Sequence, residues 1–227
     1  MISAFTIVLC LVGMLLQLSL IYAEYKKKMV AAVWLKGLAA AVFVCVGFLG
    51  LKSAGKSRFA DTVVTGLLLG AIGDVLLNLR YLTKKLEQLF FMAGIASFFL
   101  GHVMYLVSLI PFSEHLPVMI IAGLAVTAIL MAVILPKITA SAVFKGFGTV
   151  YVLTVVFMAT VAVGNLISVR NTNRTIFAIG ALFFLISDII LIFNTFGPDF
   201  SMRLSAATLI LYYIGQSLIA CSVYFHP

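Results

Sequence analysis

The sequence predicts an all-α fold: a polytopic membrane bundle with eight transmembrane helices. Hydrophobic residues make up 64% of the chain and charged residues 10%, a mixture that soluble domains do not carry on their surfaces. Apolar runs of about 20 residues, the length that crosses a bilayer core, recur throughout. The segments between these runs are too short to fold separately, so we expect residues 1–227 to form a single integral membrane domain.

The first half of the chain holds four predicted helices. Residues 2–23 lack a basic leading region and a small-residue cleavage site, so we expect a retained helix and not a cleaved signal peptide. Residues 32–51, 62–79 and 89–111 are further apolar runs of spanning length, and each is preceded by a loop that contains several lysine or arginine residues.

The second half of the chain holds four more such runs. Residues 117–135 and 146–167 are separated by a loop with Lys137 and Lys145, and residues 175–196 and 204–225 complete the set. All of them are long enough to cross the apolar core as helices. The loops leave little of the chain for any function outside the membrane.

The net charge of +8 does not indicate nucleic-acid binding, because the basic residues lie in short loops beside helix ends instead of on one face. The loops after the odd-numbered helices hold nine Lys and Arg residues, and the other loops hold five. By the positive-inside rule this bias predicts cytoplasmic odd-numbered loops and both termini outside. The compact chain favours a bacterial cytoplasmic membrane, with the endoplasmic reticulum as the alternative.

A shift of 114 residues aligns the two halves of the chain without a gap. It matches Gly66 with Gly180, Asp74 with Asp188 and Gly101 with Gly215. Helices that are four spans apart run in the same direction. The match therefore indicates a parallel repeat of four plus four helices.

Two of the seven acidic residues, Asp74 and Asp188, lie inside the most apolar stretches of the chain. A carboxylate in hydrocarbon is costly unless it has a partner or water, and such residues often mark functional sites. With about 1.5 Å of rise per residue, both lie in the half of the bilayer that the loop charges assign to the cytoplasm. A purely structural role, as clamps between helices, is the alternative.

Several other polar side chains are predicted at similar depth. We expect one pocket, open toward the inner leaflet, to contain the two carboxyl groups and these side chains. Lys36 lies about a turn inside the membrane, where it either extends to the surface, pairs with an Asp or holds a lipid phosphate. The other candidates are His102, Asn78, Tyr105, Tyr151, Asn194, Tyr213 and Gln216.

The inventory of side chains limits the chemistry. A single histidine at depth makes a zinc site improbable, and no G-x-S-x-G motif for a serine nucleophile is present, so we expect neither a metal nor a cofactor. Two carboxyl groups with one His and several Lys and Tyr residues suit general acid and base catalysis. The same carboxylates would also suit a proton-coupled transporter of small molecules or lipids.

Four segments resemble the YhhN family of eight-helix membrane proteins, which includes the lysoplasmalogenases. They are GAIGDVLLNL, FFLGHVMY, GALFFLISDIILIFN and YYIGQSLI, and the resemblance extends from the second helix to the eighth. The chain departs from the family pattern in lacking a proline after Lys36.

The resemblance implies hydrolysis of the vinyl ether bond of a lysoplasmalogen to a fatty aldehyde and glycerophospho-ethanolamine or -choline. It implies that Asp74 and Asp188 act as the acid/base pair, with His102 relaying a proton or orienting water. Lys36 would hold the phosphate, and the remaining candidates would shape the polar end of the pocket. The expected partners are a lysophospholipid substrate and membrane lipids.

Overall fold

The computed structural model describes residues 3–226, which form eight helices long and apolar enough to span a membrane. Their bounds are α1 Ala4–Tyr25, α2 Met29–Ala54, α3 Arg58–Leu79, α4 Glu87–Leu109, α5 Leu116–Ile134, α6 Ala142–Ser168, α7 Thr172–Phe196 and α8 Met202–Ser222. Short 3₁₀ segments precede α4 and follow α4, α5 and α8. The predicted all-α bundle of eight helices is confirmed, and its composition indicates an integral multi-pass membrane protein.

The predicted helix bounds differ from the observed ones by at most four residues, at the beginnings of α3 and α6. Both helices begin outside the apolar run because a serine caps them. The Ser57 hydroxyl accepts from the backbone N–H of Ala60, and the Ser141 hydroxyl from that of Phe144. Hydropathy locates the membrane core, whereas capping residues decide where a helix begins.

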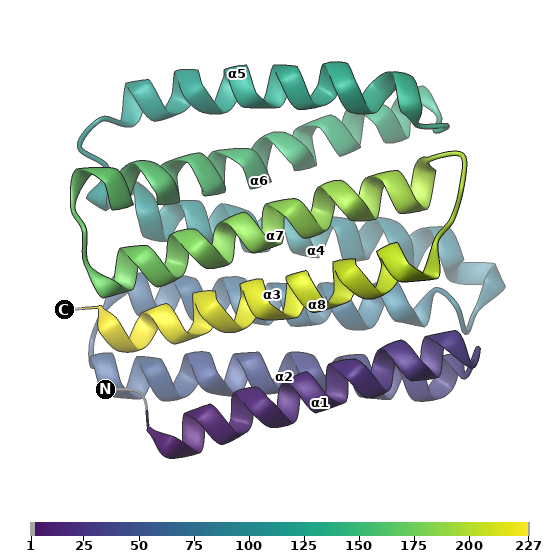
Figure 1. The fold of residues 1–227 in the computed structure, drawn as a ribbon, viewed down its shortest axis with the longest axis horizontal. Helices are drawn as coiled ribbons and strands as arrows, with labels where there is room; N and C mark the ends of the chain where they lie inside the picture. The colour runs from purple at the N-terminus through teal and green to yellow at the C-terminus, as the bar shows by residue number, and fades with distance from the viewer. Residues whose placement is uncertain (1–2, 227) are drawn as a thin grey trace.

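The helices pack side by side in order along much of the chain, and α8 returns to the first half to contact α1, α2 and α3. In Figure 1, α2 lies behind α1, α3 behind α8 and α4 behind α7, and α5 lies at the outer edge against α6. The connections α1–α2, α3–α4, α5–α6 and α7–α8 share one end of the bundle, at the right of the view. These are the loops with the larger basic charge.

The pairs α3–α4 and α7–α8 cross through matched glycines. A methyl group on Gly66 would lie 3.0 Å from the carbonyl oxygen of Gly101, and one on Gly101 would lie 3.0 Å from that of Gly66. The same reciprocal contact, at 2.9 Å, joins Gly180 and Gly215. Small residues allow membrane helices to approach this closely. The corresponding crossings agree with the four-plus-four repeat.

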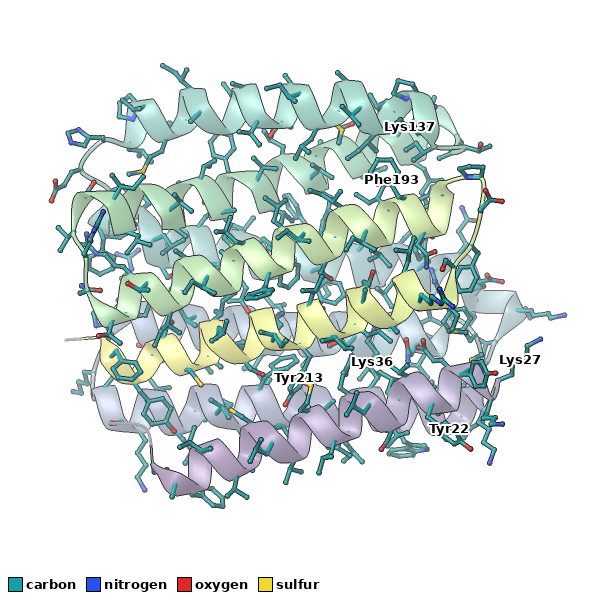
Figure 2. The ribbon with its side chains drawn as sticks, viewed as in Figure 1. Tyr22, Lys27, Lys36, Lys137, Phe193 and Tyr213 are labelled. Atoms are coloured by element: carbon teal, nitrogen blue, oxygen red, sulfur yellow. The ribbon has the colours of Figure 1, made fainter. Side chains whose placement is uncertain are left out.

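The outside of the bundle is apolar. Trp34, Ile121 and Ile167 are exposed over at least 68% of their surface, and side chains of this kind project from the outer helix faces in Figure 2. Buried polar side chains gather instead between the helices, among them Asp74, Asp188 and Gln216. The polar interior therefore has to be explained by contacts within the bundle.

Candidate active site

A central cavity of about 390 Å³ lies between α2, α3, α4, α6, α7 and α8, and Glu24 near the end of α1 also lines it. It reaches the end of the bundle that carries the α3–α4 connection, since Arg80 and Tyr81 line it. Its walls are mainly apolar, with side chains such as Phe91, Ile95, Phe99, Phe147, Leu191 and Ile192. Asp74 and Asp188 both line it. The two carboxyl groups thus share one pocket, as the sequence predicts.

Asp74 is 2% exposed and is held from two sides. The Nζ atom of Lys36 lies 3.3 Å from its Oδ1, and the hydroxyl of Tyr212 donates to its Oδ2 at 2.7 Å. In Figure 2 Lys36 lies among the helices, whereas Lys27 projects from the end of the bundle. Of the alternatives for Lys36, the structure thus has the pair with an aspartate.

Asp188 has a different partner. The hydroxyl of Tyr151 on α6 donates to its Oδ2 at 2.7 Å. No Lys, Arg or His within residues 3–226 forms an ion pair with it. In each half of the bundle, a side chain of the second helix contacts the aspartate of the third helix. The partner of Asp74 is the ammonium group of Lys36, whereas the partner of Asp188 is the phenol of Tyr151.

A hydrogen-bonded chain extends from Asp74 into the interior. The amide of Gln216 donates to the Tyr212 hydroxyl at 3.3 Å, and the hydroxyl of Tyr105 donates to the Gln216 carbonyl oxygen at 2.7 Å. Gln216 and Tyr212 share a face of α8 because they are four residues apart. Neither Gln216 nor Tyr105 lines the cavity. They fix the orientation of Tyr212 from behind.

His102 lies beside the cavity without lining it. Its Nδ1–H donates to the backbone oxygen of Phe98 at 2.7 Å, which leaves Nε2 as the acceptor nitrogen. Nε2 is buried and has no hydrogen-bond partner among the described residues. The ring packs edge to face against Phe184 and Tyr151, with centroid distances of 4.5 and 5.7 Å. His102 thus contacts the ring of Tyr151 but has no hydrogen bond to Asp74 or Asp188.

A metal site does not accompany these groups in the part of the chain that is described. No three His, Cys, Asp or Glu side chains there lie close enough together to hold a metal ion. The arrangement offers instead a carboxylate beside an ammonium, a second carboxyl group beside a phenol, and apolar walls.

The family model of the YhhN family matches residues 28–223, most of the chain. The chain belongs to the YhhN family. Membership is consistent with a lysoplasmalogenase-type membrane hydrolase. Neither the curated proteins nor the solved structures contain a significant match to this chain.

In this YhhN protein two more of the predicted binding residues, in addition to Tyr105 and Gln216, do not line the cavity. Tyr213 packs against Phe43 of α2, with ring centroids 6.3 Å apart, and fills the space over Gly13 of α1 (Figure 2). Adjacent residues of a helix project about 100° apart, so Tyr212 and Tyr213 cannot share a face. Asn194 accepts from the backbone N–H of Ser201 at 2.7 Å and anchors the α7–α8 connection.

Asn78 and Tyr151 do line the cavity, as predicted. Asn78 donates to the backbone oxygen of Ala32 at 3.4 Å and so joins α3 to α2. Sequence reasoning missed three contributors: Tyr212, Glu24 and Arg80. Tyr212 and Tyr213 lie four and three residues before Gln216, so their spacing alone does not tell which ring faces the cavity. Glu24 and Arg80 lie at helix ends, where charged residues are ordinary and carry no signal of their own.

Proposed function

We propose that this YhhN protein hydrolyses the vinyl ether bond of a lysoplasmalogen, giving a fatty aldehyde and a glycerophospho-ethanolamine or -choline. The observation that carries the proposal is the pair of differently partnered carboxyl groups, Asp74 and Asp188, in one cavity. A cavity of about 390 Å³ lies within the range of about 300–1000 Å³ typical of small-molecule sites. Its apolar walls suit a single alkenyl chain.

The different partners of the two aspartates support different roles for them in this reaction. Lys36 compensates the charge of Asp74, and Tyr212 donates a further hydrogen bond to it, so Asp74 is the anion. Asp188 has no cation beside it, and a carboxyl group in apolar surroundings is more stable neutral than charged unless it is paired. Asp188 is therefore the proton donor.

Vinyl ether cleavage needs such a pair. Asp188 gives its proton to the alkenyl carbon that is not bonded to oxygen, and the double bond supplies the electron pair, which leaves an oxocarbenium ion. The Asp74 carboxylate stabilises the positive charge of that ion. Water adds to the carbon beside oxygen and gives its proton to the Asp188 carboxylate, which forms a hemiacetal.

Collapse of the hemiacetal completes the reaction. The C–O bond to the glycerol breaks, the glycerol oxygen takes up a proton, and the hemiacetal hydroxyl loses one as the aldehyde forms. The sum is the addition of one water molecule, and each acid group returns to its initial state. Tyr151 orients Asp188, while Lys36 and Tyr212 orient Asp74.

The test is aldehyde release by the purified protein from lysoplasmalogen and from its saturated 1-O-alkyl analogue. We expect aldehyde from the vinyl ether alone, and loss of release in Asp74→Asn and Asp188→Asn. Asp61→Asn is the matched control, because Asp61 lies on the same helix as Asp74 but is exposed in its first turn. In deuterium oxide the aldehyde should carry deuterium on the carbon next to the carbonyl.

Three outcomes would contradict the proposal. Release that survives both Asp→Asn substitutions would remove the acid/base pair from the mechanism. Cleavage of the saturated analogue would exclude protonation of a double bond. Proton movement driven by substrate in proteoliposomes, without product, would favour the transporter.

A further inference from the structure

The mouth of the central cavity carries two opposite charges that do not pair with each other. Glu24 lies in the last turn of α1 and Arg80 directly after α3, and both line the cavity. Glu24 is within electrostatic reach of Arg80 and Lys36. Among the described residues, however, the one ion pair is Lys36 with Asp74, so Glu24 and Arg80 are more than 4 Å from each other's charged atoms.

Arg80 is fixed in place without an anionic partner. Its guanidinium lies over the rings of Tyr81 and Phe91, 4.6 and 4.8 Å from their centroids, and donates to the Tyr81 hydroxyl. Its Nε is buried and has no hydrogen-bond partner within residues 3–226. A guanidinium held by aromatic rings with donors left over is a suitable binding group for a phosphate.

Glu24 is the complementary group. It is partly buried, and no cation among residues 3–226 forms an ion pair with it. Lys36 and Arg80 act on this carboxylate only from beyond ion-pair distance, so it keeps room for a cation in direct contact. A ligand with a positive charge a few bonds from its phosphate would satisfy Glu24 and Arg80 together.

We propose that Glu24 and Arg80 form a head-group subsite that selects zwitterionic lysolipids, with Arg80 on the phosphate and Glu24 on the ammonium group. The subsite rests on the proposed function, since it places the same substrate in the same cavity. Arg80 follows Asp74 by six residues, about 9 Å along α3 at a rise of about 1.5 Å per residue. That separation is comparable with the glycerol and phosphate of one lysolipid.

The geometry also changes the role expected for Lys36. Its ammonium is engaged by Asp74 at 3.3 Å, deeper in the cavity than Arg80. The phosphate is thus assigned to Arg80, and Lys36 remains with the reacting end of the substrate. Lys36 then pairs with Asp74, and Arg80 binds the phosphate of the substrate.

The test is binding of saturated 1-O-alkyl lysolipids, which the proposed reaction does not consume, to the protein in detergent. One probe carries phosphoethanolamine and the other carries phosphoglycerol on the same alkyl chain. We expect Glu24→Gln to raise the Kd for the ethanolamine lipid about tenfold, the loss of one charge-assisted contact. Its Kd for the phosphoglycerol lipid should stay the same or fall. Arg80→Gln should weaken binding of both.

The controls are Glu87→Gln and Lys84→Gln, which remove the same charges from exposed positions at the same end of the bundle. Both should leave the two Kd values unchanged. Glu24→Asp and Arg80→Lys keep the charges, so each should retain more of the selectivity than the neutral variant, and thermal unfolding identifies any variant that does not fold. A ratio of the two Kd values that is the same in Glu24→Gln as in wild type would overturn the subsite.

The outcome separates this inference from the proposed function. Selective binding that depends on Glu24, without aldehyde release from lysoplasmalogen, would keep the subsite and refute the reaction. Aldehyde release together with selectivity that Glu24→Gln leaves intact would refute the subsite and keep the reaction.

Discussion

The hydroxyl of Tyr151 donates a hydrogen bond of 2.7 Å to Oδ2 of Asp188, and no cation in the described part of the chain pairs with that carboxyl group. In the other half of the bundle, Lys36, which also lies on the second helix of its half, is the partner of Asp74. The two halves have thus kept the aspartate and changed its partner. This difference gives a symmetric scaffold two unlike carboxyl groups, which an acid/base reaction requires.

Tyr151→Phe tests the contact with Asp188. It removes the hydroxyl and keeps the ring against His102. Loss of a buried hydrogen bond costs about 1–3 kcal/mol, so kcat for aldehyde release should fall about 5- to 150-fold. KM should change little, because Tyr151 contacts the acid and not the proposed head-group subsite. An increase in KM with unchanged kcat would instead place Tyr151 among the substrate-binding residues.

The adjacent tyrosines of α8 provide a matched comparison. Tyr212→Phe removes the donor to Asp74 Oδ2 and should lower kcat about tenfold or more. Tyr213→Phe removes a buried hydroxyl that has no hydrogen-bond partner among residues 3–226, so kcat should be unchanged and the melting temperature equal or higher. Steady-state kinetics and thermal unfolding of both variants check this. Equal losses of activity would contradict the assignment of the two rings to different faces of α8.

The fold could be predicted from the sequence because each membrane-spanning helix is a run of about 20 mainly apolar residues. Runs of apolar residues located all eight helices, and the 114-residue shift predicted the corresponding positions of Gly66 and Gly180, Gly101 and Gly215. Depth along a helix also followed from counting residues, so Asp74 and Asp188 were expected in one pocket. Helix positions, the repeat and the depth of a residue in the membrane all follow from residue numbers alone.

The side of each helix that faces the cavity was harder to predict. The sequence predicts Tyr213 in the pocket, but Tyr212 lines the cavity and bonds to Asp74, whereas Tyr213 packs toward α1 and α2. The sequence leaves Lys36 three alternatives, which are extension to the surface, a pair with an Asp or a lipid phosphate, and the choice depends on how α2 packs against α3. The sequence does not indicate the proposed head-group residues Glu24 and Arg80, because they come together only at a cavity formed by segments far apart in the chain. Sequence patterns describe one helix at a time, whereas a site is formed by several.

The ion pair of Lys36 and Asp74 predicts a non-additive effect on stability. Lys36→Met leaves a buried carboxylate without its cation, and breaking a buried pair in this way costs about 3–5 kcal/mol. Asp74→Asn in the same chain removes the orphaned charge, so the double variant should be more stable than Lys36→Met alone. Thermal unfolding in detergent of wild type, the two single variants and the double variant measures this double-mutant cycle.

Lys52→Met is the control for the loss of a lysine from α2, because Lys52 is exposed in the last turn of that helix. Its melting temperature should be close to that of wild type. Additive effects of Lys36→Met and Asp74→Asn would show that the two side chains do not interact in the folded protein.

The matched glycine contacts predict equal sensitivity in the two halves of the bundle. A methyl group at Gly101 or Gly215 would lie 3.0 or 2.9 Å from the backbone oxygen of the partner helix, and backbone cannot move as a flexible side chain does. Gly101→Ala and Gly215→Ala should therefore each destabilise the protein by about 1–3 kcal/mol, the usual cost of overpacking. Gly146→Ala on α6 meets nothing within 4 Å and should be neutral or slightly stabilising, since alanine favours the helix. Melting temperatures of the three variants decide the matter. A lower melting temperature for only one of Gly101→Ala and Gly215→Ala would mean that the two helix pairs do not contribute equally to stability. The four-plus-four repeat would then describe the sequence but not the packing.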